Sequence, residues 1–183
     1  MGKQFDALAA PHIKFITAQH IFFVATAASD GRVNVSPKGM DSLRVMAPDR
    51  IVWRNLTGSG NETAGHLASV NRMTLMWCGF ERQAMIMRAY GTAQTLHVGD
   101  DGFDALNAMF FNSPGARQIY DMQVEMVQTS CGYAVPFYDY VEDRQVLQDW
   151  AKDKGTEGVR SYWRERNQKT LDGKPTHVPV SEA

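Results

Sequence analysis

The fold prediction starts from residues 32–39, Arg-Val-Asn-Val-Ser-Pro-Lys-Gly. A Ser-Asp-Gly turn at 29–31 joins this stretch to the apolar run 21–28, and an apolar run followed by Asp-Gly predicts a β-hairpin. Strand alternation puts the two valines on one face. The other face carries Asn34, Ser36 and Lys38. The proline confines the strand to a sheet edge or end, so this polar row lies at a rim, either solvated or offering donors and one ammonium to an anionic ligand.

The rest of the chain continues this pattern of short strands, with helices between and after them. Further strands are expected at 51–53, 72–79, 84–96 and within 120–130, with Gly91 as a bulge or a point of close approach. Helices are expected at 61–70, at 101–111, at 143–170 with a break at Gly155, and as one or two pieces within 4–18 interrupted at Pro11. Residues 172–183 are expected to form a surface arm. The pattern predicts a mainly β, α+β fold, a small barrel with flanking helices.

Length and composition exclude several classes of protein. The chain has 183 residues, of which 44% are hydrophobic and 21% charged, and its net charge is -1. One domain over residues 1–183 is expected, with a C-terminal helical extension at about 143–170. The charge balance disfavours a disordered chain and a nucleic-acid partner. No apolar run reaches the roughly 18 residues of a membrane span, and no signal-peptide core begins the chain, so a cytoplasmic protein without a membrane partner is expected.

A second informative stretch is Trp-Arg-Asn-Leu-Thr-Gly-Ser-Gly-Asn-Glu-Thr at 53–63, where a strand runs into a glycine-rich turn before a helix. Ser59 and Glu62 have the spacing of a capping box, which predicts an ordinary helix start. Alternatively, Ser59 or Asn61 binds an anion, because Gly58 and Gly60 let backbone N–H groups converge near the positive helix end. The spacing fits neither a Walker A loop nor a dinucleotide fingerprint.

The local charge favours the anion hypothesis. Residues 32–54 hold five basic and two acidic side chains, a balance of 5 − 2 = +3 in a chain whose total is -1. Such a positive field suits a phosphate group.

Other catalytic patterns are weak. The five histidines have no metal-ligand spacing with one another or with cysteine, so no metal site is expected, and His66 is expected to be an ordinary core or surface histidine. Cys78 and Cys131 are too few for a disulfide scaffold and are expected to be reduced. A hydrolase using either thiol with a histidine is an open hypothesis that no motif supports. The aromatics Trp150, Tyr162 and Trp163 are expected to pack, or to form part of a subunit contact.

Taken in order, several segments resemble the pyridoxamine 5′-phosphate oxidase-like flavoproteins. They are Val-Asn-Val-Ser-Pro-Lys-Gly, Ile-Val-Trp-Arg-Asn-Leu-Thr-Gly-Ser, Arg-Met-Thr-Leu-Met-Trp and Glu-Arg-Gln-Ala-Met-Ile-Met-Arg-Ala-Tyr-Gly-Thr-Ala, all within residues 15–97. Residues 130–138, Ser-Cys-Gly-Tyr-Ala-Val-Pro-Phe-Tyr, resemble a subgroup of the same family. The resemblance implies a six-stranded antiparallel Greek-key split β-barrel and a homodimer that holds flavin mononucleotide (FMN) between its subunits.

The resemblance also implies which residues would contact FMN. They match the family's polar strand, the end of its next strand, the glycine turn and the Glu-Arg-Gln turn. They are Asn34, Val35, Ser36, Pro37, Lys38, Trp53, Arg54, Asn55, Ser59, Gly60, Asn61, Thr63 and Gln83. In the oxidases, the glutamine that Gln83 matches reaches FMN from the partner subunit.

Two departures from the family pattern narrow the expected function. The oxidases hold the phosphate with Gly-Ser-Arg-Lys, whereas residues 58–61 here are Gly-Ser-Gly-Asn, so the phosphate would rely on neighbouring groups. These are Ser59, Asn61, Thr63, the loop N–H groups, and Arg54 or Lys38. The family's C-terminal Trp…Arg signature is also missing, which weighs against pyridoxamine phosphate as the substrate. The expected function is an FMN-dependent oxidoreductase acting with a small-molecule substrate or nicotinamide donor; the alternative is a non-catalytic flavin- or haem-binding or sensing protein.

Overall fold

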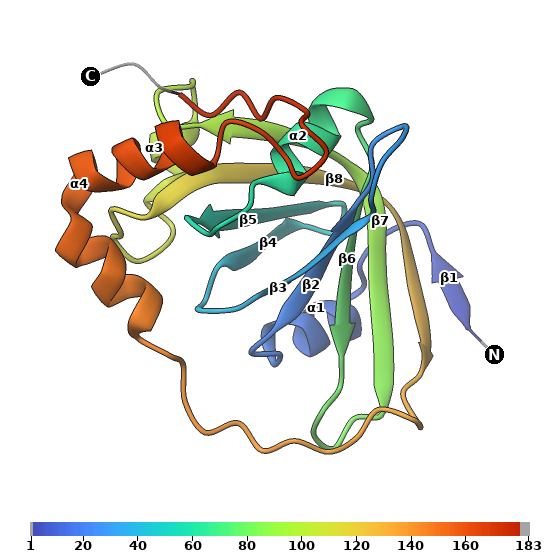
Figure 1. The fold of residues 1–183 in the computed structure, drawn as a ribbon. Helices are drawn as coiled ribbons and strands as arrows, with labels where there is room; N and C mark the ends of the chain where they lie inside the picture. Colours follow the sequence, from blue (N-terminus) through green and yellow to red (C-terminus); the bar gives the residue numbers. More distant parts are fainter. Residues whose placement is uncertain (1, 180–183) are drawn as a thin grey trace.

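The structure, a computed structural model, describes residues 2–179 and arranges them as one antiparallel sheet with four helices around it (Figure 1). The strands are Lys3–Phe5 (β1), Phe22–Thr26 (β2), Asn34–Lys38 (β3), Leu43–Ala47 (β4), Arg50–Leu56 (β5), Met73–Cys78 (β6), Met85–His97 (β7) and Ala116–Cys131 (β8). The helices are Ala10–Thr17 (α1), Glu62–Ser69 (α2), Phe103–Asn107 (α3) and Val146–Arg166 (α4).

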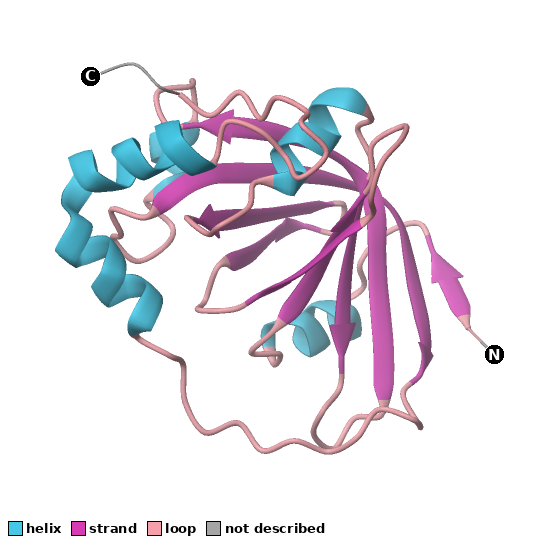
Figure 2. Ribbon diagram, in the orientation of Figure 1, coloured by secondary structure: helices cyan, strands magenta, loops and turns pink. Residues whose placement is uncertain are grey.

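The sheet is strongly curled (Figure 2). Its strands pair in the order β3-β2-β6-β7-β8-β5-β4, and β1 adds beside β8. Within residues 2–179 no ladder joins β3 to β4, so the barrel stays open between these two edges. The mainly β split-barrel prediction is therefore confirmed, but the strand number is corrected from six to eight. The unexpected strands, β1 and β4, are short or irregular, so neither shows a clear alternation of buried and exposed residues.

The inner face of the curl holds the main core. Its centre is formed by fully buried side chains from four strands, including Trp53, Leu75, Met87 and Tyr120. The predicted bulge at Gly91 is present, because the β7–β8 register shifts between Tyr90 and Gly91. A Cβ atom at Gly91 would lie 1.9 Å from the Gln123 carbonyl oxygen, so only glycine fits there.

The helices largely follow the sequence prediction. Gly155 splits α4 with a φ of 63°, a left-handed conformation that glycine adopts without strain. Pro11 does not interrupt a helix, because it lies in the first turn of α1, where its missing N–H group is unneeded. Among residues 2–179, none of the helices combines the length and the apolar character needed to traverse a bilayer.

The segment after α4 is more buried than a surface arm. Thr176 and Val178 are 1% and 3% exposed, and the Thr176 N–H group donates to the Gln168 carbonyl at 3.1 Å. A Cβ at Gly65 in α2 would meet Thr170 at 2.4 Å, so this segment lies directly against α2. The predicted arm is therefore corrected to a packed C-terminal segment, residues 167–179, and positions 180–183 of that prediction fall outside the described residues.

Candidate functional site

The edge strand β3 separates its side chains by face, as the alternation predicts. Val33, just before the strand, and Val35 are 70% and 61% exposed, whereas Asn34, Ser36 and Lys38 are half-buried. These three polar side chains face a cleft of about 190 Å³, which we call the polar cleft. It is lined by Asn34, Ser36, Lys38, Asn55, Leu56, Gly58, Ser59, Gly60, Asn61, Glu62, Thr63 and Arg117. The structure thus brings eight of the thirteen sequence-predicted residues into one place.

Lys38 supplies one positive charge at the polar cleft. Its Nζ donates to Asn55 Oδ1 at 3.0 Å and lies 5.7 Å from the centre of the Trp53 ring. Burial, together with the nearby charge of Arg117, lowers the pKa of Lys38 to about 8. No carboxylate in residues 2–179 forms an ion pair with this ammonium group.

Arg117, near the start of β8, supplies a second positive charge and is only 1% exposed. Its guanidinium donates to Asn167 Oδ1 at 2.5 Å, to the Gly60 carbonyl at 2.9 Å and to Gln118 Oε1 at 2.9 Å. Burial lowers the pKa of Arg117 to about 10, so the group stays charged at neutral pH. All of its hydrogen-bond acceptors in the described chain are neutral, so its charge is left without a counterion.

A row of amide side chains connects the two cations. Asn55 Nδ2 donates to Gln118 Oε1 at 3.2 Å, and Gln118 Nε2 donates to Asn61 Oδ1 at 3.0 Å. Asn61 Nδ2 then donates to the Asn167 carbonyl at 3.4 Å. Because every one of these amides is buried and hydrogen-bonded, the cleft wall has a fixed shape before any ligand arrives.

The glycine turn leads into α2, which begins at Glu62 with Asn61 as its N-cap residue. The capping box between Ser59 and Glu62 does not form: Ser59 is exposed, and the Glu62 carboxylate accepts the Leu171 N–H at 3.0 Å. Asn61 makes no capping bond either, because its amide joins the row described above. The helix therefore starts at the cleft with backbone N–H groups uncapped by these side chains, and its positive end favours an anion there.

Two predicted residues on β5 lie outside the polar cleft. Trp53 is fully buried in the core and stacks on Tyr120, with ring centres 4.4 Å apart. Arg54 points away from the cleft: its Nη1 donates to the Phe111 carbonyl at 2.5 Å, and its guanidinium lies over the Phe110 ring. Burial, followed by the charge of Arg44, lowers the pKa of Arg54 to about 10. Of the two basic residues expected to hold the phosphate, Arg54 and Lys38, only Lys38 lines the cleft.

Three further predicted residues are also placed elsewhere. Val35 and Pro37 are exposed on the opposite face of β3, as alternation requires. Gln83 is exposed in the turn that joins β6 to β7 and does not line the cleft of its own chain. A contact of Gln83 with a second subunit stays a prediction.

Sequence reasoning missed Arg117, which lines the cleft, and also Gln118 and Asn167, which hydrogen-bond to it from behind. β8 was expected to begin near Tyr120, so Arg117 and Gln118 were not assigned to a strand. The sequence at 116–120, Ala-Arg-Gln-Ile-Tyr, mixes polar and apolar residues, so it gives no signal that its arginine is buried or which segment lies opposite. Asn167 follows a helix far along the chain, and no local pattern connects it with the glycine turn.

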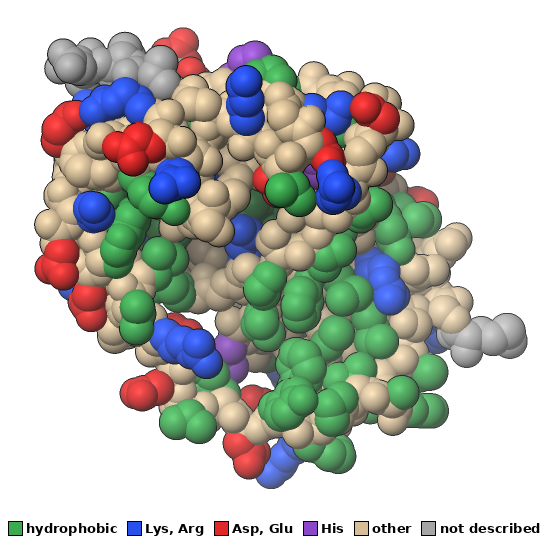
Figure 3. Space-filling view, viewed as in Figure 1, with side chains coloured by type: hydrophobic (Ala, Val, Ile, Leu, Met, Phe, Trp, Pro, Cys, Tyr) green, Lys and Arg blue, Asp and Glu red, His purple; other side chains and the backbone are tan. Residues whose placement is uncertain are grey.

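A second cavity adjoins the polar cleft. This apolar pocket has a volume of about 430 Å³ and is lined by Met40, Thr57, Gly58, Ser59, Arg144, Val146, Leu147, Trp150 and Tyr162. Trp150 and Tyr162 meet edge to face, with ring centres 5.2 Å apart. The Trp163 Nε1–H donates to Thr57 Oγ1 at 2.8 Å and fixes α4 beside the glycine turn. The predicted packing of these aromatics is thus observed, and Figure 3 shows the molecule hollowed between α4 and the sheet.

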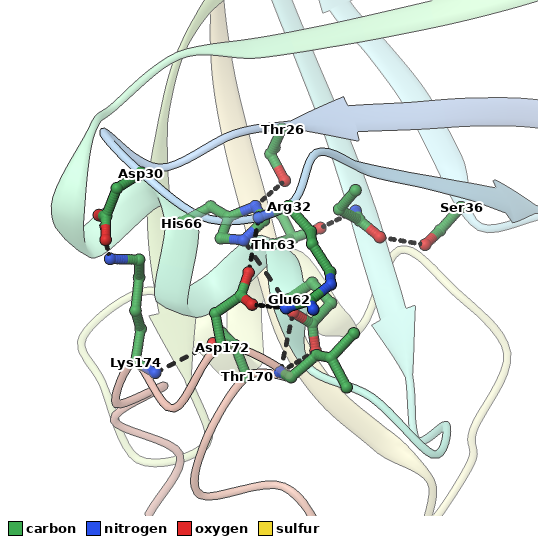
Figure 4. A network of polar contacts seen from close by, with 12 residues as sticks. Thr26, Asp30, Arg32, Ser36, Glu62, Thr63, His66, Thr170, Asp172 and Lys174 are labelled. Atoms are coloured by element: carbon green, nitrogen blue, oxygen red, sulfur yellow. Dashed lines mark hydrogen bonds and ion pairs between the residues drawn. The ribbon is translucent and has the colours of Figure 1, made fainter.

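Ion pairs fasten the C-terminal segment beside the polar cleft (Figure 4). Asp172 pairs with Arg32 and also accepts the Arg32 backbone N–H at 2.6 Å, while Lys174 pairs with Asp30 at 2.6 Å. His66 is buried in α2 and shares a hydrogen bond of 3.1 Å with Thr26, as expected of an ordinary core histidine. The C-terminal segment therefore bridges the β2–β3 turn and α2.

The comparisons with known proteins agree with this architecture. A family model described as pyridoxamine 5′-phosphate oxidase matches residues 10–131. The pyridoxamine 5′-phosphate oxidase family protein ustO of Aspergillus flavus is 37% identical over 130 residues, which are 68% of this chain and 52% of that protein. The chain thus spans about half the length of this curated relative.

Solved structures share the fold at low sequence identity. A candidate pyridoxamine 5′-phosphate oxidase from Lactobacillus delbrueckii is 21% identical with a TM-score of 0.54, over 67% of this chain and 94% of that one. A histidine-to-alanine variant of HupZ from Group A Streptococcus is 18% identical with a TM-score of 0.53, over 67% and 99% of the two chains. Since the family model covers well over half of the sequence, the chain belongs to the pyridoxamine 5′-phosphate oxidase family.

Proposed function

We propose that this protein binds FMN, with the phosphate in the polar cleft, and acts as an oxidoreductase on a small-molecule substrate or nicotinamide donor. The observation that carries the proposal is the pair of cations, Lys38 and Arg117, which face one cleft with only neutral hydrogen-bond partners. A phosphate would supply the negative charge that both groups lack. The hydroxyls of Ser59 and Thr63 and the start of α2 add donors of the kind that phosphate oxygens accept.

The sizes of the two cavities fit the two ends of FMN. Sites for drug-sized ligands measure about 300–1,000 Å³, so the polar cleft of about 190 Å³ takes a phosphate and its linker rather than a whole flavin. The apolar pocket shares Gly58 and Ser59 with the cleft and has room for a planar ring. FMN when bound supplies the redox chemistry; the chain holds the phosphate, hydrogen-bonds polar ligand atoms through Asn34 and Ser36, and shields the pocket with Trp150 and Tyr162.

A homodimer is part of the proposal. The outer face of the edge strand carries Val33 and Val35 at 70% and 61% exposure, an apolar surface next to the polar cleft. A second subunit on this face would cover it and place the cofactor between two chains. In such a dimer Gln83 would contact the cofactor bound by the partner subunit, as the family resemblance implies.

The first test is the visible spectrum of the purified protein, followed by fluorescence titrations with FMN and riboflavin. We expect bound FMN and at least a tenfold preference for FMN over riboflavin, because only FMN has the phosphate. A protein that neither carries nor takes up a flavin contradicts the proposal.

The second test is turnover. Anaerobic mixing with NADH or NADPH should bleach the flavin absorption if the protein is an oxidoreductase using a nicotinamide donor. If neither the nicotinamides nor a panel of reducing substrates reduces the bound flavin, the result identifies the alternative, a non-catalytic flavin-binding protein. A haem spectrum in place of flavin bands identifies the haem-binding alternative.

A further inference from the structure

Asn167 places the C-terminal segment directly behind the wall of the polar cleft, in contact with two of its lining residues, Arg117 and Gly58. It follows α4, lies outside the family-matched residues 10–131, and is completely buried. Its Oδ1 accepts the Arg117 Nη1–H at 2.5 Å, and its Nδ2 donates to the carbonyls of Gly58 at 3.1 Å and Ser59 at 3.4 Å. One side chain thus contacts both the buried cation and the glycine turn, to which Arg117 itself donates at Gly60.

The position of Asn167 is set from several directions. Its backbone carbonyl accepts hydrogen bonds from Asn61 Nδ2 at 3.4 Å and Thr176 Oγ1 at 2.5 Å. Its N–H group donates to the Trp163 carbonyl at 3.0 Å, which continues the last turn of α4. Because these bonds fix the backbone, the amide holds the Arg117 guanidinium in one orientation.

The chemical type of the Asn167 side chain decides whether the charge of Arg117 is cancelled within the protein. Buried arginines are most simply stabilised by a carboxylate, which satisfies the guanidinium and cancels its charge. An amide satisfies the same N–H group and cancels nothing. The Arg117 charge therefore stays available to a ligand, at a cost in stability to the ligand-free protein.

We propose that Asn167 is a positioning residue that sets the charge selectivity of the polar cleft, by orienting Arg117 without neutralising it. The cleft then prefers a dianionic phosphate monoester to the corresponding uncharged ligand. This inference rests on the proposed function in taking FMN as the phosphate monoester, but inorganic phosphate tests it without any flavin.

The decisive variant is Asn167→Asp, which keeps the shape of the side chain and places a carboxylate on Arg117. We expect FMN and inorganic phosphate to bind about 10- to 100-fold more weakly, while riboflavin affinity stays within twofold of wild type. The new carboxylate gives Arg117 a counterion but removes the two hydrogen bonds that Asn167 Nδ2 donates to the Gly58 and Ser59 carbonyls, so the ratio of FMN to riboflavin affinity is the deciding measurement. A residue with a merely structural role would instead weaken the binding of FMN and of riboflavin equally.

The matched control is Asn107→Asp, because Asn107 Oδ1 accepts a hydrogen bond from the other buried arginine, Arg54, at 3.3 Å. It adds the same charge to the same kind of group outside the polar cleft, so the affinities for FMN and phosphate should not change. An equal loss in both variants would mean that added negative charge anywhere weakens binding, and would overturn the proposal.

A second variant covers the case in which Asn167→Asp does not fold. Asn167→Ser shortens the side chain without adding charge, and it should lower the FMN-to-riboflavin affinity ratio by about threefold to tenfold.

Unchanged FMN and phosphate affinities in either folded variant overturn the role of Asn167 but leave FMN binding intact. A wild-type protein that binds phosphate but no flavin overturns FMN binding and leaves Asn167 testable with phosphate. A wild-type protein that binds neither FMN nor phosphate overturns both the proposed FMN binding and the proposed role of Asn167.

Discussion

At the residue scale, the two cations of the polar cleft differ in how they respond to pH. Arg117, with a pKa of about 10, stays charged through the neutral range. Lys38, with a pKa of about 8 lowered chiefly by burial, begins to lose its proton just above neutrality. The charge of the cleft is therefore adjustable by one unit in a narrow window, and Lys38 controls it.

FMN affinity should pass through a maximum between about pH 6 and pH 8. Below pH 6 the phosphate loses its second negative charge, and above pH 8 the free protein loses the Lys38 charge. Affinity should then fall by up to about tenfold per pH unit until the pKa of the ligand-bound lysine is reached. Fluorescence titrations from pH 5 to pH 9.5 measure this, and Lys38→Gln should abolish the decline on the alkaline side. A profile that is flat above pH 8 would exclude Lys38 as a phosphate contact.

The stability of the ligand-free protein should change in the opposite direction. The pKa of Lys38 is lower in the folded chain than the value of about 10.5 that a lysine has in an unfolded chain. Between about pH 8 and 10.5 the unfolded chain therefore binds more protons, and the contribution of this group to the free energy of unfolding rises with pH. Urea unfolding at pH 7.5 and pH 9.5 tests the sign, and a Lys38→Met variant should show a smaller rise than wild type.

Local alternation predicted the residues of β3 correctly but not those that face them across the cleft. Asn34, Ser36 and Lys38 are placed by a period of two within a single strand. Arg117 reaches the same cleft from β8, and Asn167 holds it from the residue after α4, through contacts that only the folded chain defines. Arg54 shows the converse error, because a basic residue near the glycine turn in sequence points to the other side of β5.

At the scale of single elements, the strands were found wherever turns and apolar runs delimited them. β4 and β1 were missed because the first has an irregular register and the second has only three residues. The tail was misjudged as a surface arm, since its polar composition does not reveal that it packs against a glycine of α2. Local sequence patterns thus predict where most strands lie, but they do not predict contacts between segments that are far apart in the chain.

The β7 bulge gives a prediction at this scale. Gly91→Ala should lower the free energy of unfolding by about 2 kcal/mol or more, because its Cβ would lie 1.9 Å from the Gln123 carbonyl oxygen and backbone must move. Gly158→Ala in α4 is the control: its Cβ would meet side-chain rather than backbone atoms, the nearest being Lys154 Cβ at 3.3 Å, and alanine favours a helix. Denaturant unfolding gives the free energy of unfolding of both variants. A Gly91→Ala protein as stable as wild type would refute the close approach of residue 91 to the Gln123 carbonyl.

At the scale of the whole molecule, an exposed apolar edge accompanies the open barrel. The valines of β3 and its preceding turn lie where the sheet ends, and unpaired edges of this kind invite association. The proposed homodimer would use this surface.

Val35→Lys should convert the proposed dimer to a monomer and weaken FMN binding, because a charge would be buried in the subunit contact. Leu171→Lys, at an exposed apolar position of the C-terminal segment, is the control and should leave the mass unchanged. Sedimentation equilibrium gives the mass of each. A Val35→Lys protein that remains dimeric would place the subunit contact on another surface.

The amide of Asn167 also bears on when the protein can capture its ligand. Lys38, Arg117 and Asn167 come from early, middle and late parts of the chain, so their meeting requires nearly complete folding. In a partly folded intermediate that lacks the packed C-terminal segment, the polar cleft is not yet formed and cannot bind the ligand. Ligand capture should then leave the folding rate almost unchanged and act by slowing the escape from the native state, making occupancy a form of kinetic protection.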